Sequence, residues 1–149
     1  PRAMMQASHL AGRAIDGSAT TAPHAFSYRI TTGHGVPHGH AVAITLGAVL
    51  EFNAGTTEAD CQHPRGAEHV AEVVADILGI LGVDDAEAGR VLLTDLVGRL
   101  GLDPTLEGAG AGSSHARRAI AFSPPPNRLG TNPRRFNEAT QLRLIRSIP

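Results

Sequence analysis

The sequence predicts an all-α fold of six or seven helices, and three observations point to this class. Apolar residues recur at helical spacing along most of the 149-residue chain. β-branched residues never alternate with polar ones over a length that would form a strand. Aromatic residues, which favour strands, account for only 3% of the positions.

Three helices are expected in the first third of the chain. The first covers residues 4–15 and places four residues on one face, namely Ala7, Leu10, Ala11 and Ala14. A short helix over about 23–32 and a longer one over about 37–52 each begin at a proline, which is favoured at the first helical position. Gly33 and Gly35 can end the short helix and turn the chain sharply.

Further helices are expected in the second half. One buries a stripe made of Val70, Val73, Val74, Ile77, Leu78 and Leu81. Asp84 and Asp85 begin another, which stops at Gly101 and carries Leu93, Leu96, Val97 and Leu100 on one side. Residues 103–118 are rich in Gly and Ser. Residues 123–135 are expected to be loop because Pro125 and Pro126 do not fit a helix interior. A last helix covers about 137–147.

The composition excludes several classes of protein. A net charge of −1 with 42% hydrophobic residues fits a soluble domain rather than a basic nucleic-acid binder. No window approaches the roughly 20 apolar residues of a membrane span, and the start lacks the layout of a signal peptide. Cys61 stands alone, which excludes a disulfide framework and favours a cytoplasmic location. All 13 basic residues are Arg, so no lysine serves Schiff-base or P-loop chemistry.

Four of the eight histidines crowd into residues 24–40, and two of them share a local design. His24 and His38 each follow a proline, so each imidazole lies in the first turn of its own helix. A helix N-terminus disfavours the imidazolium, and neutral imidazole is the form that binds metal. Two antiparallel helices joined by a short turn can aim both rings into one cleft. Surface or capping histidines fit the same pattern, and the spacing alone does not separate these interpretations.

Residues 20–53 resemble the signature region of iron-containing (group III) alcohol dehydrogenases. In that family a metal-binding His is followed fourteen positions later by the His of a Pro-His-Gly triplet, as His24 is by His38 here. The apolar helix HAVAITLGAVLEFN also matches. The resemblance runs from about residue 2 to the C-terminus. It implies the helical metal-binding C-terminal domain of the dehydroquinate synthase-like/iron alcohol dehydrogenase architecture, with Fe²⁺, or Zn²⁺, as the metal.

Within the family, TTAPHAFSY, PHGHAVA and RLGTNPR are most similar to the branch that reduces phosphonoacetaldehyde and similar small anionic aldehydes. One departure is Ala19, where that branch is expected to carry a Lys before the TTAPH segment. Arg117, Arg118, Arg134 and Arg135 could bind a phosphonate or carboxylate, or could simply be solvated.

The resemblance also implies parts that this chain lacks. The family binds its metal with an Asp and a His one helical turn apart (DxxxH) in addition to the two histidines, and no DxxxH precedes His24. Its nicotinamide nucleotide, NAD(P)H, is bound by an N-terminal α/β domain. Residues 1–149 are therefore expected to form a single helical domain, a fragment that is inactive alone, has no cofactor site and pairs with a missing N-terminal half.

Three further residues are candidates near the metal. Tyr28 stands one turn after His24, where many family members carry a His, and could pass a proton to the substrate oxygen or simply pack. His34 and His40 are candidate substrate-binding residues, with a loop residue and a packed residue as the respective alternatives. His40 points away from His38 on a helix, which argues against a third ligand.

Two hypotheses for the function follow. The first is the metal-binding portion of an NAD(P)H-dependent alcohol dehydrogenase/aldehyde reductase that acts on a small aldehyde or alcohol, including phosphonoacetaldehyde. The second is a non-catalytic helical binding or assembly module. Apolar faces of the first helix and of residues 70–81 are expected to be exposed when the chain is alone, which would allow homodimerisation.

Overall fold

The computed structural model describes residues 2–124 and 126–149, and eight α-helices lie within them. The described residues contain no β-strand, only an isolated antiparallel bridge between Cys61 and Arg134. The all-α prediction is confirmed. Pro1 and Pro125 lie outside the described residues.

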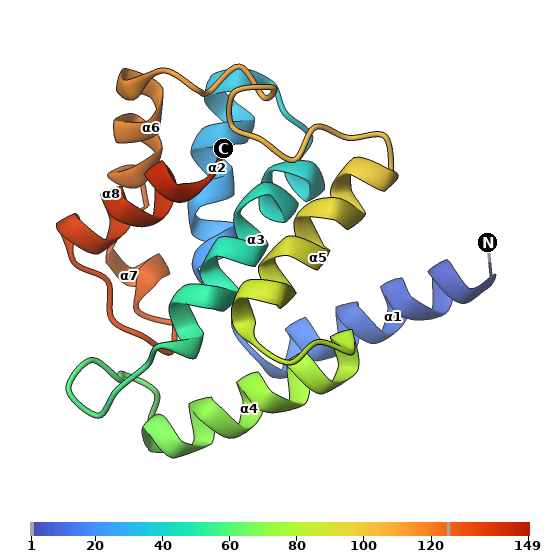
Figure 1. Ribbon diagram of the computed structural model, residues 1–149, viewed down its shortest axis with the longest axis vertical. Coiled ribbons are helices and arrows are strands. Elements are labelled where there is room, and N and C mark those ends of the chain that lie inside the picture. Colours follow the sequence, from blue (N-terminus) through green and yellow to red (C-terminus); the bar gives the residue numbers. More distant parts are fainter. Residues whose placement is uncertain (1, 125) are drawn as a thin grey trace.

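The first three helices lie close to their expected positions. Helix α1 spans Arg2–Gly17, α2 spans Ala22–His34 and α3 spans His38–Ala54. Gly35 adopts a left-handed conformation (φ 70°) and its N–H donates to the Thr31 carbonyl, which ends α2. The predicted turn between the second and third helices is therefore three residues long, and α3 returns alongside α2 (Figure 1).

The second half contains more helix than expected. Helix α4 spans Gly66–Leu81, α5 spans Ala86–Arg99, α6 spans Ser114–Ala121, α7 spans Pro126–Leu129 and α8 spans Glu138–Ser147. Asp85, Ser113 and Asn137 cap α5, α6 and α8 with their side chains. The loop prediction for residues 123–135 is wrong for one turn. Helix α7 begins at Pro126, where a proline is tolerated because the first helical N–H groups need no partner.

Helix α3 is the central element of the fold. It packs against α2, α4, α5 and α8. Helices α6 and α8 pack against each other on the side of α3 opposite to α5 (Figure 1). The core lies where these helices meet. Its largest fully buried apolar side chains are Phe26, Ile30, Leu106, Ile120 and Ile145.

The contact between α3 and α5 depends on a glycine. A Cβ atom added to Gly47 would lie 3.1 Å from both the Cα and the carbonyl oxygen of Arg90, which belong to the backbone of α5. Arg90 also forms an ion pair with Glu51 one turn further along α3, at 2.7 Å. The two helices therefore approach closely because position 47 has no side chain.

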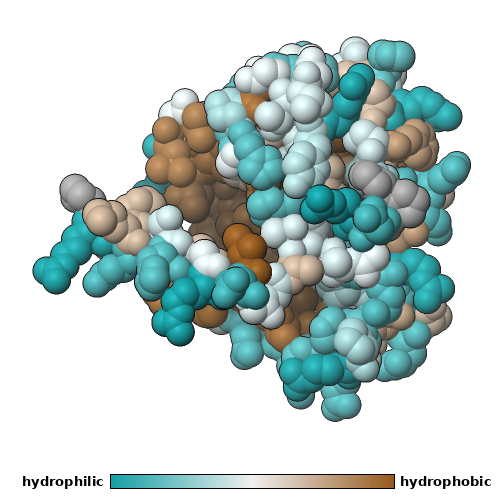
Figure 2. All heavy atoms as spheres, turned by 180° about the vertical axis from the view of Figure 1, so that it is seen from behind, coloured by the Kyte–Doolittle hydropathy of each residue, from teal (hydrophilic) through white to brown (hydrophobic). Residues whose placement is uncertain are grey.

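Apolar surface remains exposed along α1, α4 and α5. Helix α1 buries none of its residues and packs against no other helix of the described chain. The predicted stripe on α4 is buried only in part: Val70 and Val74 are buried, whereas Val73 and Ile77 are about 40% exposed, in line with the expected exposure of this face. Apolar side chains gather beside the projecting α1 when the molecule is viewed from behind (Figure 2). Within the described residues, no helix is both long and apolar enough to cross a bilayer.

The close approach of α3 and α5 leads to a stability prediction. Replacing Gly47 with Ala should lower the free energy of unfolding by about 1–3 kcal/mol, because the added methyl group meets backbone that cannot rotate away. Replacing Gly98 in α5, where a Cβ meets nothing within 4 Å, should instead raise it by about 0.5–1 kcal/mol. Urea denaturation of both variants measures the two effects. Equal stabilisation by both substitutions would show that the helices do not meet at Gly47.

Candidate metal centre

The imidazoles of His24 and His38 lie side by side. The Nε2 atom of His38 is 3.3 Å from the Nδ1 atom of His24, and the two ring centroids are 5.2 Å apart. His24 is half-buried, whereas His38 is exposed. The structure thus brings together the two residues that the sequence analysis paired, although they are fourteen positions apart.

The local sequence explains this meeting. Pro23 is buried near the start of α2, and His24 follows it in the first helical turn. Pro37, in an extended conformation, precedes His38, the first residue of α3. Because α3 packs along α2, the imidazole of its first residue reaches the His24 ring, which projects from the first turn of α2.

Ser27 fixes the orientation of the His38 ring. Its hydroxyl group donates to the His24 carbonyl at 2.8 Å and lies 3.3 Å from the Nδ1 atom of His38. A hydroxyl group has one proton, so the remaining contact requires His38 Nδ1 to donate to the Ser27 oxygen. The lone pair of neutral His38 then lies on Nε2, the atom that faces His24. Ser27 was missed by the sequence analysis, although its position three residues after His24 places it on the same side of α2.

The donor atoms of the pair fit a shared metal ion. Two nitrogen ligands held at about 2.1 Å from one tetrahedral metal lie about 3.4 Å apart, which is close to the separation found here. Imidazole nitrogen suits both iron and zinc. Two ligands do not complete such a site, and the described residues contain no group of three or more His, Cys, Asp or Glu side chains that could hold a metal.

The pair also affects its own charge state. Burial, and secondly the neighbouring His38 imidazole, lower the pKa of His24 below the ordinary value of 6.5. The neutral form, which can bind a metal, is therefore favoured at neutral pH.

Tyr28 lies beside the pair, one turn after His24. Its ring centroid is 5.7 Å from that of His38, and the side chain is 46% exposed. The guanidinium group of Arg128 also lies near Tyr28, 5.6 Å from its ring centroid. The phenol is thus close to the candidate metal position and accessible to a small molecule.

The two candidate substrate-binding histidines lie elsewhere. The Nε2 atom of His40 donates to the Asp103 carbonyl at 2.6 Å, so this ring ties α3 to the loop after α5. His34 is the last residue of α2, half-buried and at the end opposite to His24. Neither contacts the His24–His38 pair among the described side chains, and their role in binding substrate stays a prediction.

Two of the arginines considered as anion ligands have structural partners. Arg134 forms an ion pair with Asp60 at 2.7 Å and donates to the Phe52 carbonyl. Arg117 donates to carbonyl groups at the C-terminus, including that of Ile145 at 3.0 Å. These side chains hold segments of the fold together.

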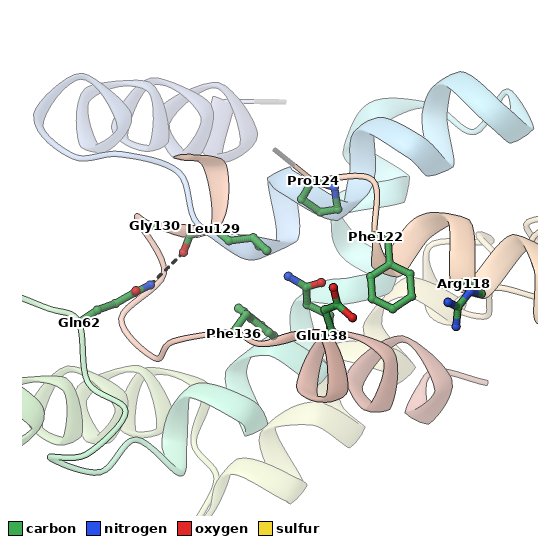
Figure 3. A pocket seen from close by; sticks show the side chains of 9 residues that line it. Gln62, Arg118, Phe122, Pro124, Leu129, Gly130, Phe136 and Glu138 are labelled. Atoms are coloured by element: carbon green, nitrogen blue, oxygen red, sulfur yellow. Dashed lines mark hydrogen bonds between the residues drawn. The ribbon is translucent and has the colours of Figure 1, made fainter. Parts of the chain in front are cut away.

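Arg118 lines a hollow of about 510 Å³ between α6 and α8 that contains Glu138 and no histidine (Figure 3). A carboxylate in the same hollow opposes the binding of an anion. This space therefore lies apart from the candidate metal centre and has a different chemical character.

A match to the sequence model of a known family identifies the family of this chain. The model for the Fe-containing alcohol dehydrogenase family, C-terminal, matches residues 1–148. The chain belongs to the Fe-containing alcohol dehydrogenase family. The resemblance found in the sequence is thus confirmed, as is the assignment of the helical fold to the C-terminal domain of this family.

A curated relative of this iron alcohol dehydrogenase domain supports the same assignment. The chain is 34% identical over 143 residues to a phosphonoacetaldehyde reductase of Streptomyces viridochromogenes. The aligned region covers 96% of this chain and 35% of the relative, so the chain spans about a third of the relative's length. No solved structure matches the chain.

The lowered pKa of His24 leads to a prediction for the iron alcohol dehydrogenase domain. In metal-free protein, an NMR titration should give His24 a pKa below 6.5. The variant His38→Gln should raise this pKa only part of the way, because burial is the larger cause and remains.

The lowered pKa of His24 also determines how the stability of the folded protein changes with pH. The unfolded chain takes up the proton more readily than the folded chain, so the contribution of neutral His24 to stability is lost as the pH falls below about 6.5. A His24→Gln variant should show a flatter loss of stability on acidification. An unshifted His24 titration in the wild type would contradict the described packing.

Proposed function

We propose that His24 and His38 supply two ligands of the catalytic metal in an NAD(P)H-dependent alcohol dehydrogenase or aldehyde reductase. The observation that carries the proposal is the 3.3 Å separation of their ring nitrogens at the start of two adjacent helices. Membership of the iron alcohol dehydrogenase family supports iron as the metal, with zinc as the alternative that imidazole also suits.

The remaining parts of the site are proposed to come from outside these residues. Two nitrogen ligands leave a metal shell incomplete. The relative is nearly three times as long as the aligned region, which leaves room for an N-terminal half that carries the other ligands and the nucleotide site. In this proposal residues 1–149 form one helical domain that is inactive without that half.

The chemistry divides between the bound groups and this chain. A bound metal ion would act as a Lewis acid on the substrate oxygen, and NAD(P)H would supply the hydride. His24 and His38 would hold the metal through ring nitrogens, and burial favours the neutral, metal-binding form of His24. Ser27 accepts from His38 Nδ1 and so presents the Nε2 lone pair of that ring.

Tyr28 is proposed to assist proton transfer. Its phenol lies next to His38 and remains accessible, so it can donate a hydrogen bond to an oxygen atom bound near the pair. The Tyr28→Phe variant tests this role against simple packing, because it retains the ring and removes only the hydroxyl group.

The proposed substrate is a small aldehyde, with phosphonoacetaldehyde as the first candidate. The name of the Streptomyces relative and the 34% identity support this choice. The second candidate function, a non-catalytic binding or assembly module, is favoured by the exposed apolar residues of α1, α4 and α5, which also allow a homodimer. The two functions differ in whether the gene encodes a DxxxH segment and a nucleotide-binding domain before this chain.

Metal analysis of the whole protein tests the ligand assignment. His24→Ala and His38→Ala should each lower bound iron or zinc at least about tenfold, since even loss of an outer-shell partner costs 10–100-fold in affinity. Ser27→Ala should weaken metal binding by about that outer-shell factor. His115→Ala, a change at an exposed histidine of α6, serves as the matched control and should retain the metal. Unchanged metal content in the His38 variant would refute the assignment.

A further inference from the structure

A hollow on the outer side of α2 contains two arginines and no acidic residue. It has a volume of about 360 Å³ and lies between α2 and the segment from α6 to α7. Its lining residues, all in the described part of the chain, are Ala25, Tyr28, Arg29, Thr32, Ser123 and Arg128. We propose that Arg29 and Arg128 form the subsite for the anionic group of the substrate. This inference rests on the proposed function and names the substrate class as small anionic aldehydes.

Both guanidinium groups are available to an external anion. Neither Arg29 nor Arg128 forms an ion pair with a described side chain, in contrast to Arg90 and Arg134. The Arg29 side chain lies along α2 beside Gly33, with Nε 3.6 Å from where a Cβ of that glycine would stand. Two guanidinium groups in one hollow match the planar, bidentate recognition of phosphonate, phosphate or carboxylate oxygens.

Tyr28 connects the hollow to the candidate metal centre. The Arg128 guanidinium lies over one side of its ring at 5.6 Å, and His38 lies 5.7 Å from the same ring. Stacking on an aromatic ring leaves the N–H donors of an arginine free at its edge. Tyr28 thus contacts both the cationic group and one of the proposed metal ligands, so a small substrate bound beside its ring would lie near both.

The hydroxyl groups of Thr32 and Ser123 do not compete for this role. Thr32 donates to the Tyr28 carbonyl at 2.8 Å, and Ser123 donates to the Ile120 carbonyl at 2.9 Å. Their protons are therefore engaged. The positive charge of the two arginines is the feature that selects for an anion, in a chain that has no lysine.

The α6–α8 hollow provides the contrast. It contains a single arginine, Arg118. This side chain lies over the ring of Phe122 and shares the hollow with the carboxylate of Glu138 (Figure 3). It has neither a second cation nor a link to the histidine pair. Arg118→Gln is therefore a matched control for a change of the same size and charge.

The test compares two aldehydes in the whole protein. The kcat/KM values for phosphonoacetaldehyde and for uncharged propionaldehyde are measured in wild type, Arg128→Gln, Arg29→Gln and Arg118→Gln. The ratio of phosphonoacetaldehyde to propionaldehyde should fall about tenfold to a hundredfold in each of the first two variants, mainly through KM for the phosphonate. Arg128→Lys, which keeps the charge, should recover part of the ratio. Arg118→Gln should leave the ratio unchanged.

A second readout does not depend on turnover. Calorimetric titration with methylphosphonate should show binding to the wild type and to Arg118→Gln, and at least tenfold weaker binding to Arg128→Gln. Equal loss of both aldehyde activities in Arg128→Gln, with methylphosphonate binding intact, would overturn the subsite and leave Arg128 as a support for Tyr28. If the whole protein reduces neither aldehyde, the proposed function fails, and the titration alone then decides whether the arginines bind an anion.

Discussion

The packing of α3 along α2 is the constraint on which the rest of the structure depends. Small buried side chains on both helices, including Ala22, Ala25 and Ala41, allow the two backbones to lie close together. Buried Thr45 donates to the Val42 carbonyl and lies 3.4 Å from that of Pro23, so the start of α2 contacts the second turn of α3. This register carries the first residue of α3 over Ser27 and His24. Helix α5, held at close range by Gly47, supports α3 from its other side.

The candidate site follows from that register rather than from any single motif. The register brings the ring of His38, the first residue of α3, against that of His24 in the first turn of α2. Ser27 then selects the tautomer that exposes the His38 nitrogen, and partial burial keeps His24 neutral. Tyr28 lies one turn further along α2, where it touches both the histidine pair and Arg128. Residues with separate chemical roles thus share one face of a single helix.

Local signals in the sequence were sufficient for much of the fold. Two helices have a proline at or just before their first turn, and one of them ends at a glycine. With apolar spacing, these signals predicted α1 to α5 and α8 to within a few residues, because they act through local backbone geometry. The turn at α7 was missed because two prolines suggest a loop, although a helix can begin at the second. Periodicity located the apolar face of α4, but it could not show which residues of that face another element of this chain covers.

The site was predictable only in part for a similar reason. The pairing of His24 and His38 was anticipated from the family spacing, since fourteen residues comprise one short helix and one turn. The approach of Arg128 to Tyr28 joins residues a hundred positions apart and depends on how α7 docks on α2, which no local pattern specifies. The same holds for His40, whose contact with the Asp103 carbonyl arises from the path of a distant loop.

The most direct test of the central claim is a crystal structure of the iron-loaded whole protein, with anomalous scattering recorded at the iron absorption edge. The account predicts one strong peak between the rings of His24 and His38, within about 2.2 Å of one nitrogen atom of each. A peak bound elsewhere, with these two imidazoles still 3.3 Å apart and unliganded, would contradict it.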